Sequence, residues 1–93
     1  MKKFVMVTTD SRGVFAGKLK SYDAEAKVAV LNGARMCVYW PKECRGVLGL
    51  ASVGPLNGAK ITQAVKRIRL EGVVSITDVS ESAQALWESE PWS

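Results

Sequence analysis

The fold is decided by residues 27–40, which have the sequence KVAVLNGARMCVYW. Apolar residues fill the run before Asn32-Gly33, the dipeptide most typical of a two-residue β-hairpin turn. The segment therefore predicts a strand over 27–31, a turn at Asn32-Gly33, and a second strand over 34–40 that pairs back on the first.

The residues before this segment extend the same pattern toward the N-terminus. Residues 3–9 are rich in Val and Thr, and the turn-forming run 10–13 (DSRG) follows them, so we expect a hairpin with a return strand over 14–21. Gly17 has no side chain to pack and predicts a bulge or bend where a small sheet curls. Residues 23–26 form the next turn. The first forty residues therefore predict a four-stranded antiparallel meander.

A short central helix is expected after the meander. Pro41 favours its start, because proline is tolerated at the first helical position and cannot continue a central strand. Four apolar residues at helical spacing form the stripe that we expect to face the core: Cys44, Val47, Leu48 and Ala51. Two internal glycines make the helix weak, and Gly54-Pro55 ends it.

The last third of the chain predicts strands and a second helix. Residues 60–70 are strand-like, and Gly72 separates them from a β-branched run over 73–79. Asp78 or Ser80 can cap a final helix, whose apolar stripe is Ala83, Leu86 and Trp87. Residues 1–93 thus predict a single α+β domain, a small antiparallel sheet or partly closed roll of about five or six strands, with one short central helix and one C-terminal helix.

Composition argues against catalysis. The chain has no histidine, which removes the commonest general base and the commonest zinc ligand. Cys37 and Cys44 match neither a redox nor a metal-binding spacing, and we expect them as thiols. The carboxylates are scattered, so no acid-base pair can be inferred. We therefore expect a protein that is not an enzyme and that holds no metal or cofactor.

Charge is divided unevenly along the chain, although the net charge is only +4. Residues 1–69 carry thirteen Lys and Arg against four acids, a net charge of +9, whereas residues 70–93 carry five acids and no base, a net charge of −5. This asymmetry indicates either an anionic ligand on one face or an acidic end that neutralises the basic body. The apolar run 4–7 is too short for a signal peptide or a membrane span, so a cytoplasmic protein is expected.

Two basic segments are candidate binding sites. Residues 34–40, as a strand, place Arg35 and Tyr39 on one face and Trp40 on the other. Arginine beside an aromatic can hold a phosphate and stack on a base; the alternative is that the aromatics are core or interface residues and Arg35 is a solvated edge residue. The remaining candidates are cations that either face phosphates or form a solvated strand face or turn: Arg12, Lys66, Arg67 and Arg69.

Three segments resemble a family of small uncharacterised proteins encoded by tailed phages and prophages: residues 13–19 (GVFAGKL), 28–35 (VAVLNGAR) and 39–40 (YW). The similarity covers most of the chain and departs from the family pattern over 53–60. It implies a phage or prophage origin and no established activity.

This resemblance suggests a protein that works by binding. The leading hypothesis is an accessory protein in the host cytoplasm that antagonises host defence, either by sequestering a cyclic nucleotide messenger or by blocking a defence protein complex. The alternatives are a nucleic-acid-binding module and a structural or assembly component of the virion. Because a chain this short buries only roughly 60% of its unfolded surface, a homo-oligomer is also expected.

Overall fold

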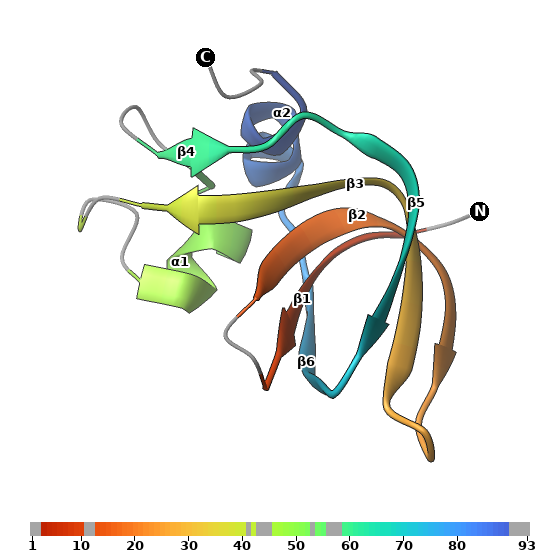
Figure 1. The fold of residues 1–93 in the computed structure, drawn as a ribbon. Helices are drawn as coiled ribbons and strands as arrows, with labels where there is room; N and C mark the ends of the chain where they lie inside the picture. Colours follow the sequence, from red (N-terminus) through yellow and green to blue (C-terminus); the bar gives the residue numbers. More distant parts are fainter. Residues whose placement is uncertain are drawn as a thin grey trace.

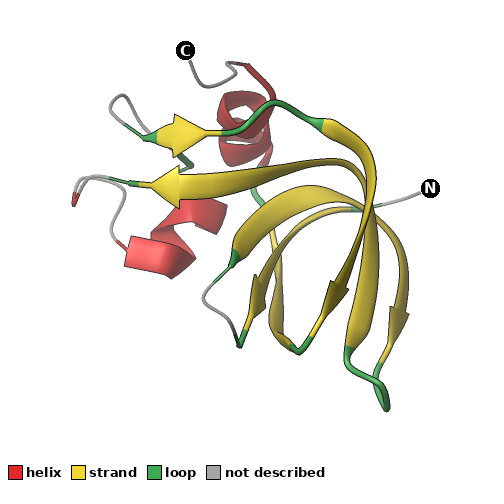
Figure 2. Ribbon diagram, viewed as in Figure 1, coloured by secondary structure: helices red, strands yellow, loops and turns green. Residues whose placement is uncertain are grey.

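The computed structural model describes residues 3–10, 13–40, 42, 46–52, 54–55 and 59–89 (Figure 1). The elements follow the order β1 (Phe4–Thr9), β2 (Val14–Asp23), β3 (Val28–Tyr39), α1 (Gly46–Ser52), β4 (Lys60–Ile61), β5 (Val65–Glu71), β6 (Val73–Asp78) and α2 (Glu81–Ser89). Figure 2 shows a curled sheet with the two helices gathered beside it. This arrangement confirms the predicted α+β fold with a short central helix and a C-terminal helix. Neither described helix is long and apolar enough to cross a membrane.

The sheet is antiparallel and curls on itself. Its order is β4-β3-β2-β1-β6, and β5 also pairs with β3. The edge strands β5 and β6 are joined directly at Gly72, so the two edges of the sheet meet at that turn (Figure 1). Gly72 has a φ of +68°, and its carbonyl accepts a hydrogen bond from the amide of Asp10 at 2.9 Å. No ladder joins the described strands β5 and β6, so the roll is only partly closed.

The hairpin predicted at Asn32-Gly33 is wrong. Strand β3 continues through these residues and pairs with β2 on one side and β5 on the other. Gly33 does have the positive φ of a turn residue, +59°, but it forms a β-bulge in which Gly33 and Ala34 together lie opposite Gly17. Because β2 and β5 supply hydrogen-bonding partners on both sides, the chain need not fold back on itself. Among the first forty residues, the described part of the chain therefore forms the three strands β1, β2 and β3 rather than a four-stranded meander.

Gly17 lies at the bend that the sequence predicted. A Cβ there would approach the carbonyl oxygen of Asn32 to 2.9 Å and Cα of Ala34 to 3.0 Å. The glycine therefore allows β2 and the bulged part of β3 to come close together.

The bulge decides which side chains of β3 face the helices. Leu31 and Ala34 are both buried in the interior of the roll, whereas Asn32 and Arg35 both face the outer side, opposite Lys18 and Ala16 of β2 respectively. Strict alternation would have placed Asn32 and Arg35 on opposite faces. The extra residue thus brings these two polar side chains to one surface.

Two hydrophobic clusters lie on the two faces of the sheet. Alternation along β1 sends Val5 and Val7 to the interior cluster and Met6 to the cluster under the helices. Further members of the interior cluster are Ala29, Leu31, Ala34, Leu70 and Val73. The cluster under the helices includes Ala16, Cys37, Leu50, Ala51, Ala83 and Trp87. The helices therefore complete a second core on the outer face of the roll.

The apolar stripe predicted for the central helix is partly wrong. Leu48 is 68% exposed, and Leu50 and Ala51 are the buried side chains of α1. Within the described helix, Gly46–Ser52, the buried face is thus centred on Leu50 and Ala51 rather than on Leu48. Pro41, Cys44 and the side chain of Val47 lie outside the described residues.

The end of α1 is held mainly by Ser80, which precedes α2, and by Trp87 of α2. The last four carbonyls of a helix have no partner within it, and in α1 each accepts a hydrogen bond from elsewhere. The Gly54 amide donates to the carbonyl of Gly49, and the Trp87 indole donates to that of Leu50. The amide and the hydroxyl of Ser80 donate to the carbonyls of Ala51 and Ser52 respectively. All four bonds measure 2.9–3.0 Å. Ser80 also caps α2, because its Oγ accepts from the amide of Ala83 at 3.1 Å.

Candidate functional site

A row of side chains crosses the outer face of the sheet. Phe4 of β1 lies opposite Lys18 of β2, Lys18 lies opposite Asn32 of β3, and Asn32 lies opposite Arg67 of β5. Residues directly opposite each other in neighbouring strands share a face of the sheet. Arg67 Nε donates to Asn32 Oδ1 at 3.4 Å. The register thus places an aromatic ring, two cations and an amide side by side.

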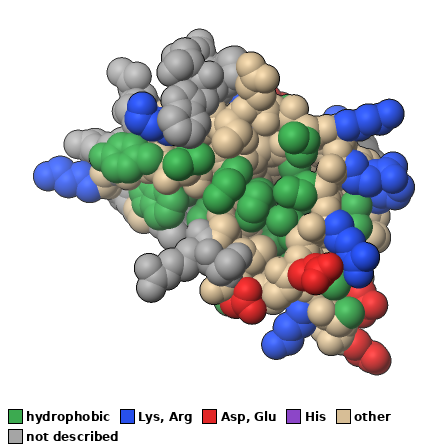
Figure 3. All heavy atoms as spheres, in the orientation of Figure 1, with side chains coloured by type: hydrophobic (Ala, Val, Ile, Leu, Met, Phe, Trp, Pro, Cys, Tyr) green, Lys and Arg blue, Asp and Glu red, His purple; other side chains and the backbone are tan. Residues whose placement is uncertain are grey.

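Two more exposed cations extend this row along the strands. Arg69 lies opposite Val30, the next outward position after Asn32 on β3, and Lys20 is the extra residue where β2 shifts register between Leu19 and Ser21. We call Lys18, Lys20, Arg67 and Arg69 the cationic face. Figure 3 shows Lys and Arg side chains gathered on the right-hand side of the view, where β5 crosses the curled sheet.

Few carboxylates neutralise the cationic face. Arg69 Nε lies 3.8 Å from Glu71 Oε2, in a pair exposed to solvent. Among the described residues, no carboxylate lies within 4.0 Å of Lys18, Lys20 or Arg67. Three of the four cations of this face are therefore in no ion pair with a described carboxylate, and their charge favours the binding of anions.

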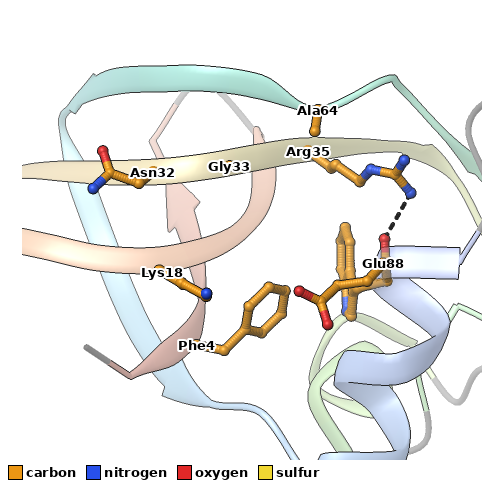
Figure 4. Close-up of a pocket in the computed structure, with 8 residues that line it drawn as sticks. Phe4, Lys18, Asn32, Gly33, Arg35, Ala64 and Glu88 are labelled. Atoms are coloured by element: carbon orange, nitrogen blue, oxygen red, sulfur yellow. Dashed lines mark hydrogen bonds between the residues drawn. The ribbon is translucent and has the colours of Figure 1, made fainter. Parts of the chain in front are cut away.

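A pocket of about 400 Å³ adjoins the cationic face, between the outer surface of the sheet and the end of α2. The residues that line it are Phe4, Lys18, Asn32, Gly33, Arg35, Ala64, Trp87 and Glu88 (Figure 4). In the close-up, Lys18 and Glu88 extend toward the ring of Phe4 from opposite sides. Glu88 Oε1 accepts a hydrogen bond from Gln84 Nε2 at 3.4 Å. The pocket thus combines an aromatic wall with cationic, amide and carboxylate groups.

Arg35 anchors α2 at the side of this pocket. Its Nη1 donates to the carbonyl oxygen of Trp87 at 2.8 Å (Figure 4). Carbonyls in the last turn of a helix lack intrahelical donors, and a cation there is favoured by the helix dipole. Arg35 is half-buried, so it is not the solvated edge residue of the alternative interpretation. It lines the pocket while it holds the helix.

The other residues predicted with Arg35 lie elsewhere. Tyr39, at the end of β3, is 53% exposed and pairs with Lys60 of β4. Trp40 is half-buried and packs against the cluster under the helices. Neither residue is among those that line the pocket. The aromatic-basic surface predicted from Arg35, Tyr39 and Trp40 is therefore not assembled around this pocket.

The predicted basic run on β5 is divided between two faces. Arg67 and Arg69 belong to the cationic face, whereas Lys66 is exposed at the intervening position and points to the other side of the strand. Arg12 lies outside the described residues.

Sequence reasoning missed eight residues of this site: Phe4, Lys18, Lys20, Asn32, Gly33, Ala64, Trp87 and Glu88. One local signal was present, because Lys18 and Lys20 flank the apolar Leu19 in a predicted strand. That spacing is typical of a strand with one charged face. The contributions of Phe4 and Glu88 depend on where β1 and α2 lie in the fold.

No group of three or more His, Cys, Asp or Glu side chains among the described residues is arranged to hold an ion. Cys37 is buried under the helices, and its Sγ donates a hydrogen bond to the carbonyl oxygen of Tyr39 at 3.4 Å.

Comparison with known proteins identifies the family of this chain. The model of a family described as a domain of unknown function (DUF6948) matches residues 2–87. No curated protein matches the sequence. The matched range contains the whole cationic face and every residue that lines the pocket except Glu88.

Proposed function

We propose that this chain, which belongs to the DUF6948 family, is a non-enzymatic protein that binds nucleic acid through the phosphates. The observation that carries the proposal is the cationic face, where four exposed Lys and Arg side chains lie on two strands that flank β3. Lysine and arginine bound to phosphates release condensed counterions, and this release supplies most of the affinity of such contacts.

The shape of the face favours an extended ligand. Neighbouring strands lie about 4.8 Å apart, so the backbones at Lys18 and Arg67 are separated by roughly 10 Å across β3, and Arg67 and Arg69 by about 7 Å along β5. A patch of this extent on an open sheet surface suits a ligand with several phosphates. We therefore favour nucleic acid over a single small anion.

A free nucleotide is the second candidate, because the pocket beside Lys18 has room for one. The resemblance to phage and prophage proteins suggests a setting for this alternative, in which the protein sequesters a cyclic nucleotide messenger in the host cytoplasm and so antagonises defence. A defence protein as partner, a virion role and a homo-oligomer stay predictions from the sequence.

Fluorescence anisotropy with a labelled oligonucleotide tests the proposal. The protein should bind at about 50 mM salt and lose affinity steeply toward 200 mM. Replacing both Lys18 and Arg67 by glutamine should weaken binding and lower the slope of log affinity against log salt by about 1.4 to 1.8, as expected for two lost phosphate contacts.

A matched control removes the same charge elsewhere. Lys42 and Lys60 are exposed and lie outside the cationic face, and their replacement by glutamine should change the slope much less. Equal losses in the two double variants would refute the proposed surface. Absence of oligonucleotide binding at low salt, with tight binding of a cyclic dinucleotide, would establish the second candidate instead.

A further inference from the structure

The pocket is continuous with the cationic face. Lys18 and Asn32 belong both to the row that crosses the sheet and to the pocket lining. A nucleic-acid strand whose phosphates contact Lys18 and Arg67 would therefore bring a nucleobase to the mouth of the pocket.

We propose that this pocket receives one unstacked nucleobase, so that the ligand is single-stranded nucleic acid. The inference rests on the proposed function and specifies its ligand. A volume of about 400 Å³ lies within the range of roughly 300–1,000 Å³ that is typical of small-molecule sites. A base paired within a duplex would first have to leave its stack, at a cost of a few kcal/mol.

Phe4 supplies the surface on which a base would stack. Its side chain is half-buried, packs against the cluster under the helices and lines the pocket, so the ring is held in place before a ligand arrives. Stacking of a base on an aromatic side chain contributes about 1–3 kcal/mol and tolerates every base. Phe4 therefore accounts for affinity without sequence preference.

Glu88 supplies a preference among bases. Its carboxylate extends into the pocket from α2 (Figure 4), and an ionised carboxylate only accepts hydrogen bonds. Guanine presents two adjacent N–H donors on its Watson–Crick edge and can engage both carboxylate oxygens, whereas thymine presents a single donor between two carbonyls. The pocket should therefore favour guanine and disfavour thymine.

Fluorescence anisotropy with a labelled oligothymidine of twelve nucleotides tests both the preference for single strands and the preference for guanine. A strand with one central guanine should bind about tenfold more tightly than oligothymidine alone, in line with bidentate recognition of a base edge, and both should bind more tightly than a duplex of equal length. Glu88→Gln should abolish the guanine preference while oligothymidine binding stays equal or rises, because a negative charge has been removed.

Two further variants separate the pocket from the charge of the helix. Glu81→Gln changes an exposed carboxylate in the first turn of α2, away from the pocket lining, and should keep the guanine preference. Phe4→Leu should weaken single-strand binding about tenfold without changing duplex binding, as expected for a lost stacking contact, and Phe4→Tyr should restore it. Thermal unfolding of each variant checks that the fold is intact.

The outcomes distinguish this inference from the proposed function. Salt-dependent binding that is equal for duplex and single strand, with no effect of guanine, would overturn the pocket proposal and leave the cationic face as the binding surface. Loss of guanine preference in Glu81→Gln as well as in Glu88→Gln would also overturn it. Failure of every oligonucleotide to bind would refute both.

Discussion

Replacing Arg35 by alanine tests how α2 is held on the sheet. In the parent chain, Arg35 Nη1 donates to the carbonyl oxygen of Trp87 at 2.8 Å. The variant removes this charge-assisted bond and also the cation that lies beside the negative end of the helix dipole. We expect α2 to lose part of its attachment while its cap at Ser80 remains.

The expected cost follows from the type of bond. Hydrogen bonds that involve a charged group contribute about 1.5–3 kcal/mol, and this one is only partly buried, so we expect a loss of about 2 kcal/mol in the free energy of unfolding. For a domain of this size, such a loss corresponds to a fall in Tm of roughly 8–16 °C. Arg35→Lys should recover part of it, because the charge remains although the guanidinium geometry is lost.

Urea and thermal unfolding followed by circular dichroism measure this effect. Arg67→Ala is the matched control, since it removes an exposed arginine from the adjacent strand, and we expect a change within about 0.5 kcal/mol. An Arg35→Ala variant that unfolds at the parent temperature would refute the anchoring role. Equal losses of unfolding free energy in both variants would indicate that the effect comes from net charge rather than from the bond with Trp87.

Three more substitutions test particular features of the fold by urea unfolding. Gly33→Ala should cost about 1–2 kcal/mol because its φ is positive, although a Cβ there meets no atom within 4 Å; an unchanged midpoint would contradict the bulge. Leu50→Ala should lower the free energy of unfolding by about 2–5 kcal/mol, and Leu48→Ala, at an exposed position, by less than about 0.5 kcal/mol. The reverse order would support the buried face predicted from the sequence. Ser80→Ala should cost about 1–2 kcal/mol as a lost helix cap, whereas Ser82→Ala should be nearly neutral, and similar losses would argue against the cap.

The parts of the fold that were predicted correctly depend on local chemistry. Gly72 has the positive φ that a tight turn between two strands requires, and Ser80 caps the helix that begins at the next residue. In each case the side chain, or its absence, acts on backbone within a few residues. Local features of this kind can be predicted from the sequence alone.

Asn32-Gly33 shows where local chemistry is insufficient. The dipeptide favours a left-handed backbone, and Gly33 adopts one. Whether that conformation turns the chain or bulges a continuous strand depends on whether partner strands lie on both sides. Here the partners are β2 and β5, and β5 is far away in the sequence.

The candidate site was harder to predict for the same reason. Arg35, Tyr39 and Trp40 were grouped because they are neighbours in sequence, but they lie along a strand that passes from the pocket to the far end of the sheet. Lys18 and Arg67 are brought together only by the register of three strands. Hydrophobic periodicity assigns residues to faces, but it does not specify which strands become neighbours.

The contacts at the end of α1 have a consequence for how the molecule opens. A helix of seven residues is too short to persist alone in water, and three of its last four carbonyls are bonded to Ser80 or Trp87. When α2 detaches, these carbonyls lose their donors and α1 loses its support. The two helices should therefore melt as one cooperative unit, and their amide protons should exchange with solvent at matching rates while the rolled sheet beneath stays protected.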